Sequence, residues 1–117
     1  MEQRELDELM TQLASDAEVF AEKEYEMTLA KNVASFRDVD DLVDRVVARA
    51  ESDVLDDKAL FTLANVFGAY VGEIVKAEIG GVWVYDTSDA HAPAVYLALG
   101  DKQFPFASMV YQRLIGR

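Results

Sequence analysis

The chain has 117 residues, 51% of them hydrophobic, and a formal net charge of −11 at pH 7. This length and hydrophobicity predict a single domain with a packed core and exclude a disordered chain. The negative charge opposes binding to nucleic acid and to anionic membrane surfaces, and the lack of cysteine excludes disulfides and cysteine metal sites.

The net charge is confined to the first half of the chain. Residues 1–57 hold 17 Asp or Glu against 6 Lys or Arg, whereas residues 58–117 hold 5 of each. The second half also contains the only Trp, both Pro and all six Gly. We therefore expect one domain, residues 1–117, in which an acidic helical half joins an apolar α+β half.

A cytoplasmic location is expected from two features of the apolar residues. The N-terminus is not followed by the apolar run that a signal peptide needs. The longest apolar stretch, from Ala59 to Val71, is shorter than the ~20 residues that a membrane span requires. No contact with a membrane is therefore expected.

The first predicted helix carries an apolar stripe at helical spacing from Leu6 to Ala21, and its expected stop is Asn32. Glu24 falls near the middle of that stripe. The helix is therefore expected to break or drift there, or to turn Glu24 inward. Drift is favoured because apolar residues after Glu24 continue a rotated line.

Two more helices are expected before the glycine-rich part of the chain. One starts near Asp38, because carboxylates crowd its first turn, where the positive end of the helix dipole favours anions. The other, from Asp57 to Ile79, is apolar around most of its circumference, which is typical of a central helix. Gly68 and Gly72 lie one turn apart on it and predict close packing against another helix.

The rest of the chain predicts a small antiparallel meander and a last helix. Gly80 and Gly81 end the third helix, and one of them is expected to have a positive φ. The expected strands are 82–85, 94–99 and 102–104. Pro105 suits the start of a helix over 106–115. The predicted fold is α+β, with three N-terminal helices, an antiparallel sheet of two or three strands and a C-terminal helix.

The sequence offers few residues for catalysis. His91 is the only histidine and lies in a polar loop, where it is expected to be exposed. The acidic cluster around Asp40 lacks the spacing and the glycine of a calcium loop. We therefore assign no catalytic residue, no cofactor and no metal, and we do not expect an enzyme.

Glu73 is the one carboxylate with a chemical interpretation. It follows Gly72 on the most apolar helix, and it is either exposed or faces a pocket beside Trp83 or Tyr85. A carboxylate with a raised pKa in such a pocket would serve as the base of an enzyme. An enzyme with Glu73 as its base is therefore one functional hypothesis, and two others, described below, come before it.

The first hypothesis is a non-enzymatic protein-binding domain whose acidic helices dock a basic protein. A bacterial antidote or inhibitor of that protein is the specific role suggested by analogy. The expected partner-binding residues are Asp40, Asp44 and Glu51, which lie toward one side of the second helix, together with Trp83 and Tyr85.

The two aromatic residues alternate with valines, so they point to one face of their strand. If the valine face covers the helices, Trp83 and Tyr85 are displayed together, a composition enriched in interface hot spots. Packing of Trp83 in the core is the alternative. The second functional hypothesis also uses these residues: a homo-oligomeric module, such as a homodimer, or a small-molecule-binding regulatory module, built on this pair and on the small-residue face at Gly68 and Gly72.

Four short motifs of the second half are GAYVGE at 68–73, GGVW at 80–83, FPF at 104–106 and VYQRL at 110–114. Together they resemble an uncharacterised bacterial family of small domains with a Gly-x-Tyr-x-Gly-Glu helix, a Gly-Gly-x-Trp strand start and a closing Pro-Phe helix. The resemblance covers residues 60–117 and leaves the acidic half outside. It implies an α+β domain of bacterial type and supplies no catalytic residues.

Overall fold

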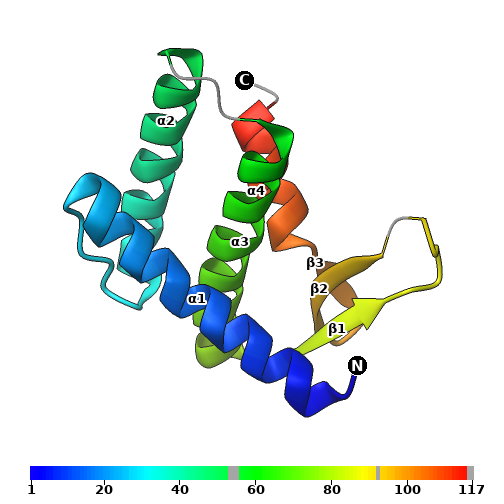
Figure 1. The fold of residues 1–117 in the computed structure, drawn as a ribbon. Helices are drawn as coiled ribbons and strands as arrows, with labels where there is room; N and C mark the ends of the chain where they lie inside the picture. The colour runs from blue at the N-terminus through cyan, green and yellow to red at the C-terminus, as the bar shows by residue number, and fades with distance from the viewer. Residues whose placement is uncertain (53–55, 92, 116–117) are drawn as a thin grey trace.

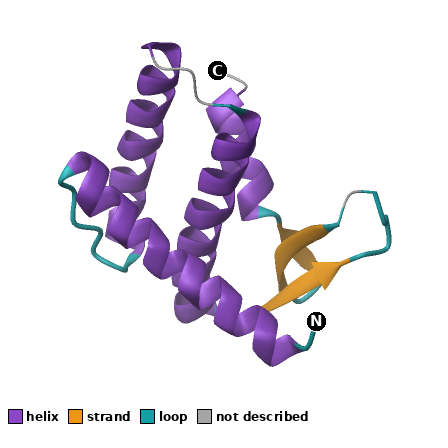
Figure 2. Ribbon diagram, viewed as in Figure 1, coloured by secondary structure: helices purple, strands orange, loops and turns teal. Residues whose placement is uncertain are grey.

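The computed structural model describes residues 1–52, 56–91 and 93–115, with the side chains of the first range described up to Arg49. These residues form an α+β fold of four α-helices and one three-stranded antiparallel sheet (Figures 1 and 2). The helices are α1 Gln3–Tyr25, α2 Phe36–Ser52, α3 Asp57–Ile79 and α4 Phe106–Ile115, and the strands are β1 Val82–Asp86, β2 Ala94–Leu99 and β3 Lys102–Phe104.

Helix α3 lies at the centre, with α1 crossing it on one side and α4 packed along another (Figure 1). Its buried residues include Phe67 and Tyr70, which join the core formed with α1 and α2. A second apolar cluster lies under the sheet and includes Leu6 and Met10 of α1 with Trp83 and Leu97 of the strands. The sheet is thus fastened to the end of the helical layer by its own small core.

The sheet is a meander in the order β1-β2-β3. Trp83 pairs with Leu97 across the first two strands, and Leu97 pairs with Phe104 across the next. Trp83 and Leu97 are both buried, so this row of side chains forms the inner face of the sheet. Val82, one residue away, points to the outer face and is exposed.

Helix α1 ends earlier than the sequence indicated. It stops at Tyr25, and Glu26 takes the left-handed conformation with φ 52°. The amide of Met27 then donates to the carbonyl of Ala21, a bond typical of a helix end that turns away. Drift of the helix at Glu24 was therefore the wrong choice. The helix breaks just after this exposed residue, whose carboxylate accepts a hydrogen bond from Arg49 of α2 at 3.0 Å.

Helix α2 also begins slightly before its predicted start. A short 3₁₀ turn, Val33–Ser35, precedes it, and the side chain of Asn32 caps this turn by accepting a hydrogen bond from Ala34 N. The buried hydroxyl of Tyr70 accepts a bond from Lys31 N and lies 3.0 Å from Ser35 Oγ. Asn32 therefore begins the 3₁₀ turn, which is hydrogen-bonded to Tyr70 of α3, and does not end α1.

Helix α3 has the predicted bounds, and both of its ends have local causes. The side chain of Asp56 caps it by accepting a hydrogen bond from Ala59 N at 2.8 Å. Gly80 and Gly81 follow it with φ of 91° and 119°, as predicted for a helix stop. Among the described residues, α3 alone is long and apolar enough to cross a membrane by length and composition, a test that the core helix of a soluble protein also passes. Half of its most apolar window is buried inside the structure.

Candidate functional site

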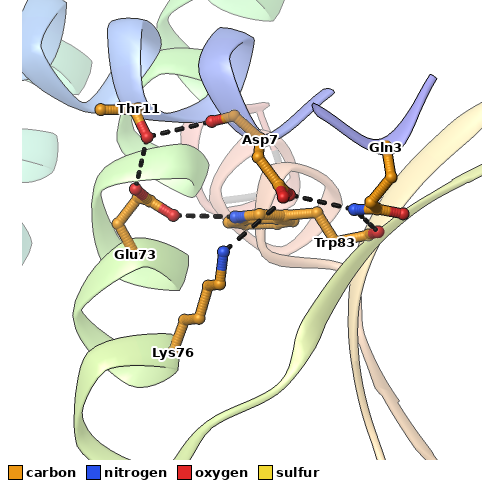
Figure 3. A network of polar contacts seen from close by, with 6 residues as sticks. All are labelled: Gln3, Asp7, Thr11, Glu73, Lys76 and Trp83. Carbon is orange, nitrogen blue, oxygen red and sulfur yellow. Dashed lines mark hydrogen bonds and ion pairs between the residues drawn. The ribbon is translucent and has the colours of Figure 1, made fainter. Parts of the chain in front are cut away.

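Glu73 lies at the junction of α3, α1 and β1 (Figure 3). The indole Nε1 of Trp83 donates a hydrogen bond to Glu73 Oε2 at 2.9 Å, and Thr11 Oγ lies 2.9 Å from Glu73 Oε1. The hydroxyl of Thr11 is equally close to the backbone carbonyl of Asp7, so its single proton is shared between the two acceptors. The carboxylate is thus partly buried and bound on both oxygens.

The same network fastens the first turn of α1 to the edge of the sheet (Figure 3). Gln3 Nε2 donates to the backbone carbonyl of Trp83 at 2.9 Å and to Asp7 Oδ1 at 3.0 Å. The ammonium of Lys76 lies 3.9 Å from the same Asp7 oxygen. Side chains from three elements therefore hold α1, α3 and β1 in one arrangement.

This geometry is that of a structural carboxylate. Glu73 lies beside Trp83, as the pocket interpretation required, but it points its oxygens at two donors of the protein itself. It satisfies an indole N–H that would otherwise be buried without a partner, which is costly. The adjacent hollow, about 210 Å³, is small and is bordered by Thr11, Lys31 and Tyr70 as well as Glu73.

Trp83 is 1% exposed, so it packs in the core and is not displayed on the surface together with Tyr85. Its ring lies against Gly72: a Cβ built on Gly72 would sit 2.1 Å from Trp83 Cη2. The aromatic face of β1 covers the helices at this point and the valine face does not. A glycine on an apolar helix opposite a lone tryptophan is the sequence signal that indicates this packing.

The two glycines of α3 pack against different elements. A Cβ on Gly68 would lie 2.6 Å from the backbone of Ala107, so α3 and α4 approach closely there. Gly72 receives the ring of Trp83 from β1 instead of a helix. The close helix packing expected at both positions is therefore found at Gly68 alone.

Tyr85 and Trp83 lie on the same face of β1, but Trp83 is buried and Tyr85 is exposed. Tyr85 is 42% exposed, because the strand runs outward beyond the helices that cover Trp83. The structure does not bring the two rings together on one surface. His91 is exposed in the following loop, and its backbone amide donates to Asp89 Oδ1.

Asp40 and Asp44 are exposed, as expected, but they are not free. Both lie on one side of α2 and bind the guanidinium of Arg113 on α4, with Arg113 Nη2 2.8 Å from Asp44 Oδ1. The hydrogen bond that Arg113 donates to Asp40, followed by the one that it donates to Asp44, raises the pKa of Arg113. The two carboxylates thus join α2 to α4, while the side chain of Glu51 lies outside the described residues.

Helix α1 carries the acidic surface that lacks such partners. In the part of the chain that the structure describes, five exposed carboxylates of α1 and its caps have no cation within ion-pair distance, namely Glu2, Glu5, Asp16, Glu22 and Glu26. Glu5 belongs to the capping box of the helix, and Asp16 accepts a bond from Gln12. The outward face of α1 is therefore strongly negative.

Several residues of these networks were not identified from the sequence. Arg113 lies 73 positions from Asp40, so only the tertiary fold brings them together. Gln3, Asp7 and Thr11 recur every four residues beside the apolar stripe, and such a polar row is a signal of a polar contact on that side of the helix.

Within residues 1–49, 56–91 and 93–115, no three histidine, aspartate or glutamate side chains converge as metal ligands. Comparison of the chain with protein-family models, with curated proteins and with solved structures finds no match. The resemblance to the uncharacterised bacterial family therefore remains a proposal carried by its four motifs.

Proposed function

We propose that this chain is a non-enzymatic protein-binding domain whose acidic helix α1 docks a basic protein. The observation that carries the proposal is the group of exposed carboxylates on α1 and its caps without cation partners in the described part of the chain. The sequence favoured α2 for this role. The contacts of Asp40 and Asp44 with Arg113 support α1 instead, because those two carboxylates already serve the fold.

The physical basis is long-range attraction. A net charge of −11 that originates in one half of the chain produces a strongly directional field. Such a field raises the association rate of an oppositely charged partner by about 10–1,000-fold at low ionic strength. The exposed carboxylates outside the capping box of α1, such as Asp16 and Glu22, contribute little to folding, since exposed charge changes are worth within about ±0.5 kcal/mol. Inhibition of a basic bacterial enzyme or toxin is the specific form of the proposal, and it rests on analogy with small acidic antidotes.

Capture from a bacterial lysate with matched baits tests the proposal. One bait carries Glu5→Lys, Asp16→Lys and Glu22→Lys on α1. The control bait carries Glu78→Lys, Asp89→Lys and Asp101→Lys, which are exposed residues of the second half and give the same change in net charge.

The natural protein and the control bait are expected to retain the same basic proteins at low salt, and the α1 bait is expected to lose them. Equal loss from both altered baits would show that only the total charge matters. Recovery of no basic protein by the natural bait would overturn the proposal.

A further inference from the structure

An apolar groove lies on the sheet-facing side of α3, and Trp83 is the one lining residue that also belongs to the network of Figure 3. It consists of two adjoining hollows of about 330 Å³ and 180 Å³, which share the lining residues Phe61, Asn65, Val95 and Ala107. Figure 1 shows the elements that border it, α1, α3, α4 and the sheet, gathered around this side of α3. The larger hollow is within the range of about 300–1,000 Å³ that is usual for binding pockets.

The groove displays large apolar side chains that the fold leaves exposed. Phe61 is 60% exposed, and its ring is held on the rim by an edge contact with Tyr111 at 6.0 Å between centroids. Leu9 of α1, 41% exposed, forms the opposite rim. The ring of Trp83 lines the groove between them. A fixed exposed aromatic residue beside a pocket is the composition of an interface hot spot.

The α1 rim of this groove is acidic. Glu5 precedes Leu9 by one helical turn and Asp16 follows it by two, so the three residues lie on one side of α1. Both carboxylates are exposed, and no described cation lies within ion-pair distance of either. An occupant of the groove therefore meets an apolar floor and a negative edge.

We propose that this groove binds an amphipathic helix of the basic partner, with its apolar residues against Phe61 and Leu9 and its Lys or Arg residues toward Glu5 and Asp16. The inference rests on the proposed function and adds where and how the partner is held. A helix laid in an apolar groove is an established mode of peptide recognition. An added strand is disfavoured beside α1, because the Trp83 carbonyl at the edge of β1 is already bound by Gln3.

A second copy of this chain is a poorer occupant for an electrostatic reason. A two-fold dimer through the groove would place the same surface on both partners. The Glu5 and Asp16 rims of the two copies would then border one interface and repel each other, since like charges placed opposite each other are unfavourable. A segment with cationic flanks has no such penalty.

The test uses a synthetic peptide of leucine and lysine, about 18 residues or five helical turns long, with the leucines on one face. Its binding to the full chain is followed in two ways: by fluorescence anisotropy of a label on the peptide, and by the NMR signal of the Trp83 indole N–H. The chain contains a single tryptophan and the peptide contains none, so this signal comes from Trp83, whose ring lines the groove and whose N–H is bound to Glu73. A peptide with the same composition and no amphipathic order is the sequence control.

Phe61→Ser is expected to weaken binding of the ordered peptide at least tenfold, which is about 1.4 kcal/mol and the size of a hot-spot loss. Ile79→Ser is the matched control, because Ile79 lies on the same helix, is also 60% exposed and lies outside the groove. The amphipathic peptide is expected to shift the Trp83 indole signal, and the control peptide without amphipathic order is not. If thermal melting shows that Phe61→Ser fails to fold, Leu9→Ser replaces it.

The remaining outcomes distinguish failure of the groove proposal from failure of the proposed function. If Glu5→Lys with Asp16→Lys weakens binding while Phe61→Ser and the indole signal do not respond, the groove is overturned and acidic docking stands. If Phe61→Ser weakens binding and charge reversal does not, the acidic role is overturned. Failure of the natural chain to bind the peptide at low salt would overturn both. Dimerisation that rises with protein concentration and disappears in Phe61→Ser would assign the groove to a second copy.

Discussion

At Gly72 the packing leaves no room for even one methyl group. In a helix with free space, replacing glycine by alanine stabilises by roughly 0.5–1 kcal/mol. Here the added Cβ would sit 2.1 Å from the buried ring of Trp83, so the sign of the effect is reversed. Gly72→Ala is expected to destabilise the fold by about 1–3 kcal/mol through overpacking. Urea unfolding measures this, and an unchanged or higher midpoint would contradict the placement of the ring.

The bond between Glu73 and Trp83 separates a structural carboxylate from a surface charge. Glu73→Gln retains an oxygen that accepts from the indole Nε1, whereas Glu73→Leu leaves that buried donor without a partner. The leucine variant is expected to cost about 1–3 kcal/mol more than the natural residue, and the glutamine variant clearly less. Thermal or urea unfolding of both variants is the measurement. Equal stabilities would show that the indole bond has no role.

Asp86 supplies a pH dependence at the end of β1. The backbone amide of Ser88 donates to Asp86 Oδ1 at 2.9 Å, and this bond lowers the pKa of Asp86. A lowered pKa stabilises the folded loop above the ordinary carboxylate pKa, and this contribution disappears as the pH falls through the folded value. In an NMR titration Asp86 is expected to protonate at a pH below the ordinary aspartate pKa of about 3.9. A midpoint at or above that pKa would contradict this assignment.

At the scale of elements, Arg113 joins α2 to α4 across 69 to 73 residues of sequence. Its partners Asp40 and Asp44 are more than half exposed, so their coupling with it is expected to be only about 0.2–1 kcal/mol and to weaken with salt. A double-mutant cycle of Asp44→Ala with Arg113→Ala measures this coupling. The cycle of Asp41→Ala with Arg113→Ala is the control, because Asp41 pairs with Arg45. Equal coupling energies in the two cycles would show that the bridge is absent in solution.

The elements that the sequence predicted well are those with local signals at both ends. Helix α3 has a capping aspartate before it and two glycines after it, and the strands 94–99 and 102–104 are bounded by proline and a Gly-Asp turn. The end of α1 was missed because Glu26 is not a residue that favours the left-handed conformation. Its turn depends on the packing of the segment that follows against Tyr70 of α3.

The candidate site was predictable in its charge and not in its geometry. Composition alone indicated an acidic helical half. It did not show that Arg113 binds the α2 carboxylates, since that pairing depends on how α4 packs on α3. Nor did it show that Phe61 lies at a groove rim, because an apolar residue on a mostly buried helix is ordinarily expected inside.

At the scale of the whole molecule, the fold separates its stabilising contacts from its acidic surface. The apolar packing centres on α3, and the polar network around Glu73 closes the end near the sheet. The outward face of α1 takes little part in either and retains unpaired charge in the described chain. Charge reversal there is therefore expected to change association with a partner. Reversal of Asp16 and Glu22 is expected to leave the melting temperature nearly unchanged, whereas Glu5→Lys also removes the capping-box bond of α1 and lowers it.

The central claim is that the acidic face of α1 docks a basic protein, and the association rate constant tests it most directly. Stopped-flow mixing with a partner recovered by the natural bait is carried out from about 0.01 M salt, where the Debye length is ~30 Å, to 1 M, where it is ~3 Å. The association rate is expected to fall steeply as the salt concentration rises. At low salt, the variant with Glu5→Lys, Asp16→Lys and Glu22→Lys is expected to associate at least about tenfold more slowly than the equally charged second-half control. Equal rates for these two variants at low salt would contradict the central claim.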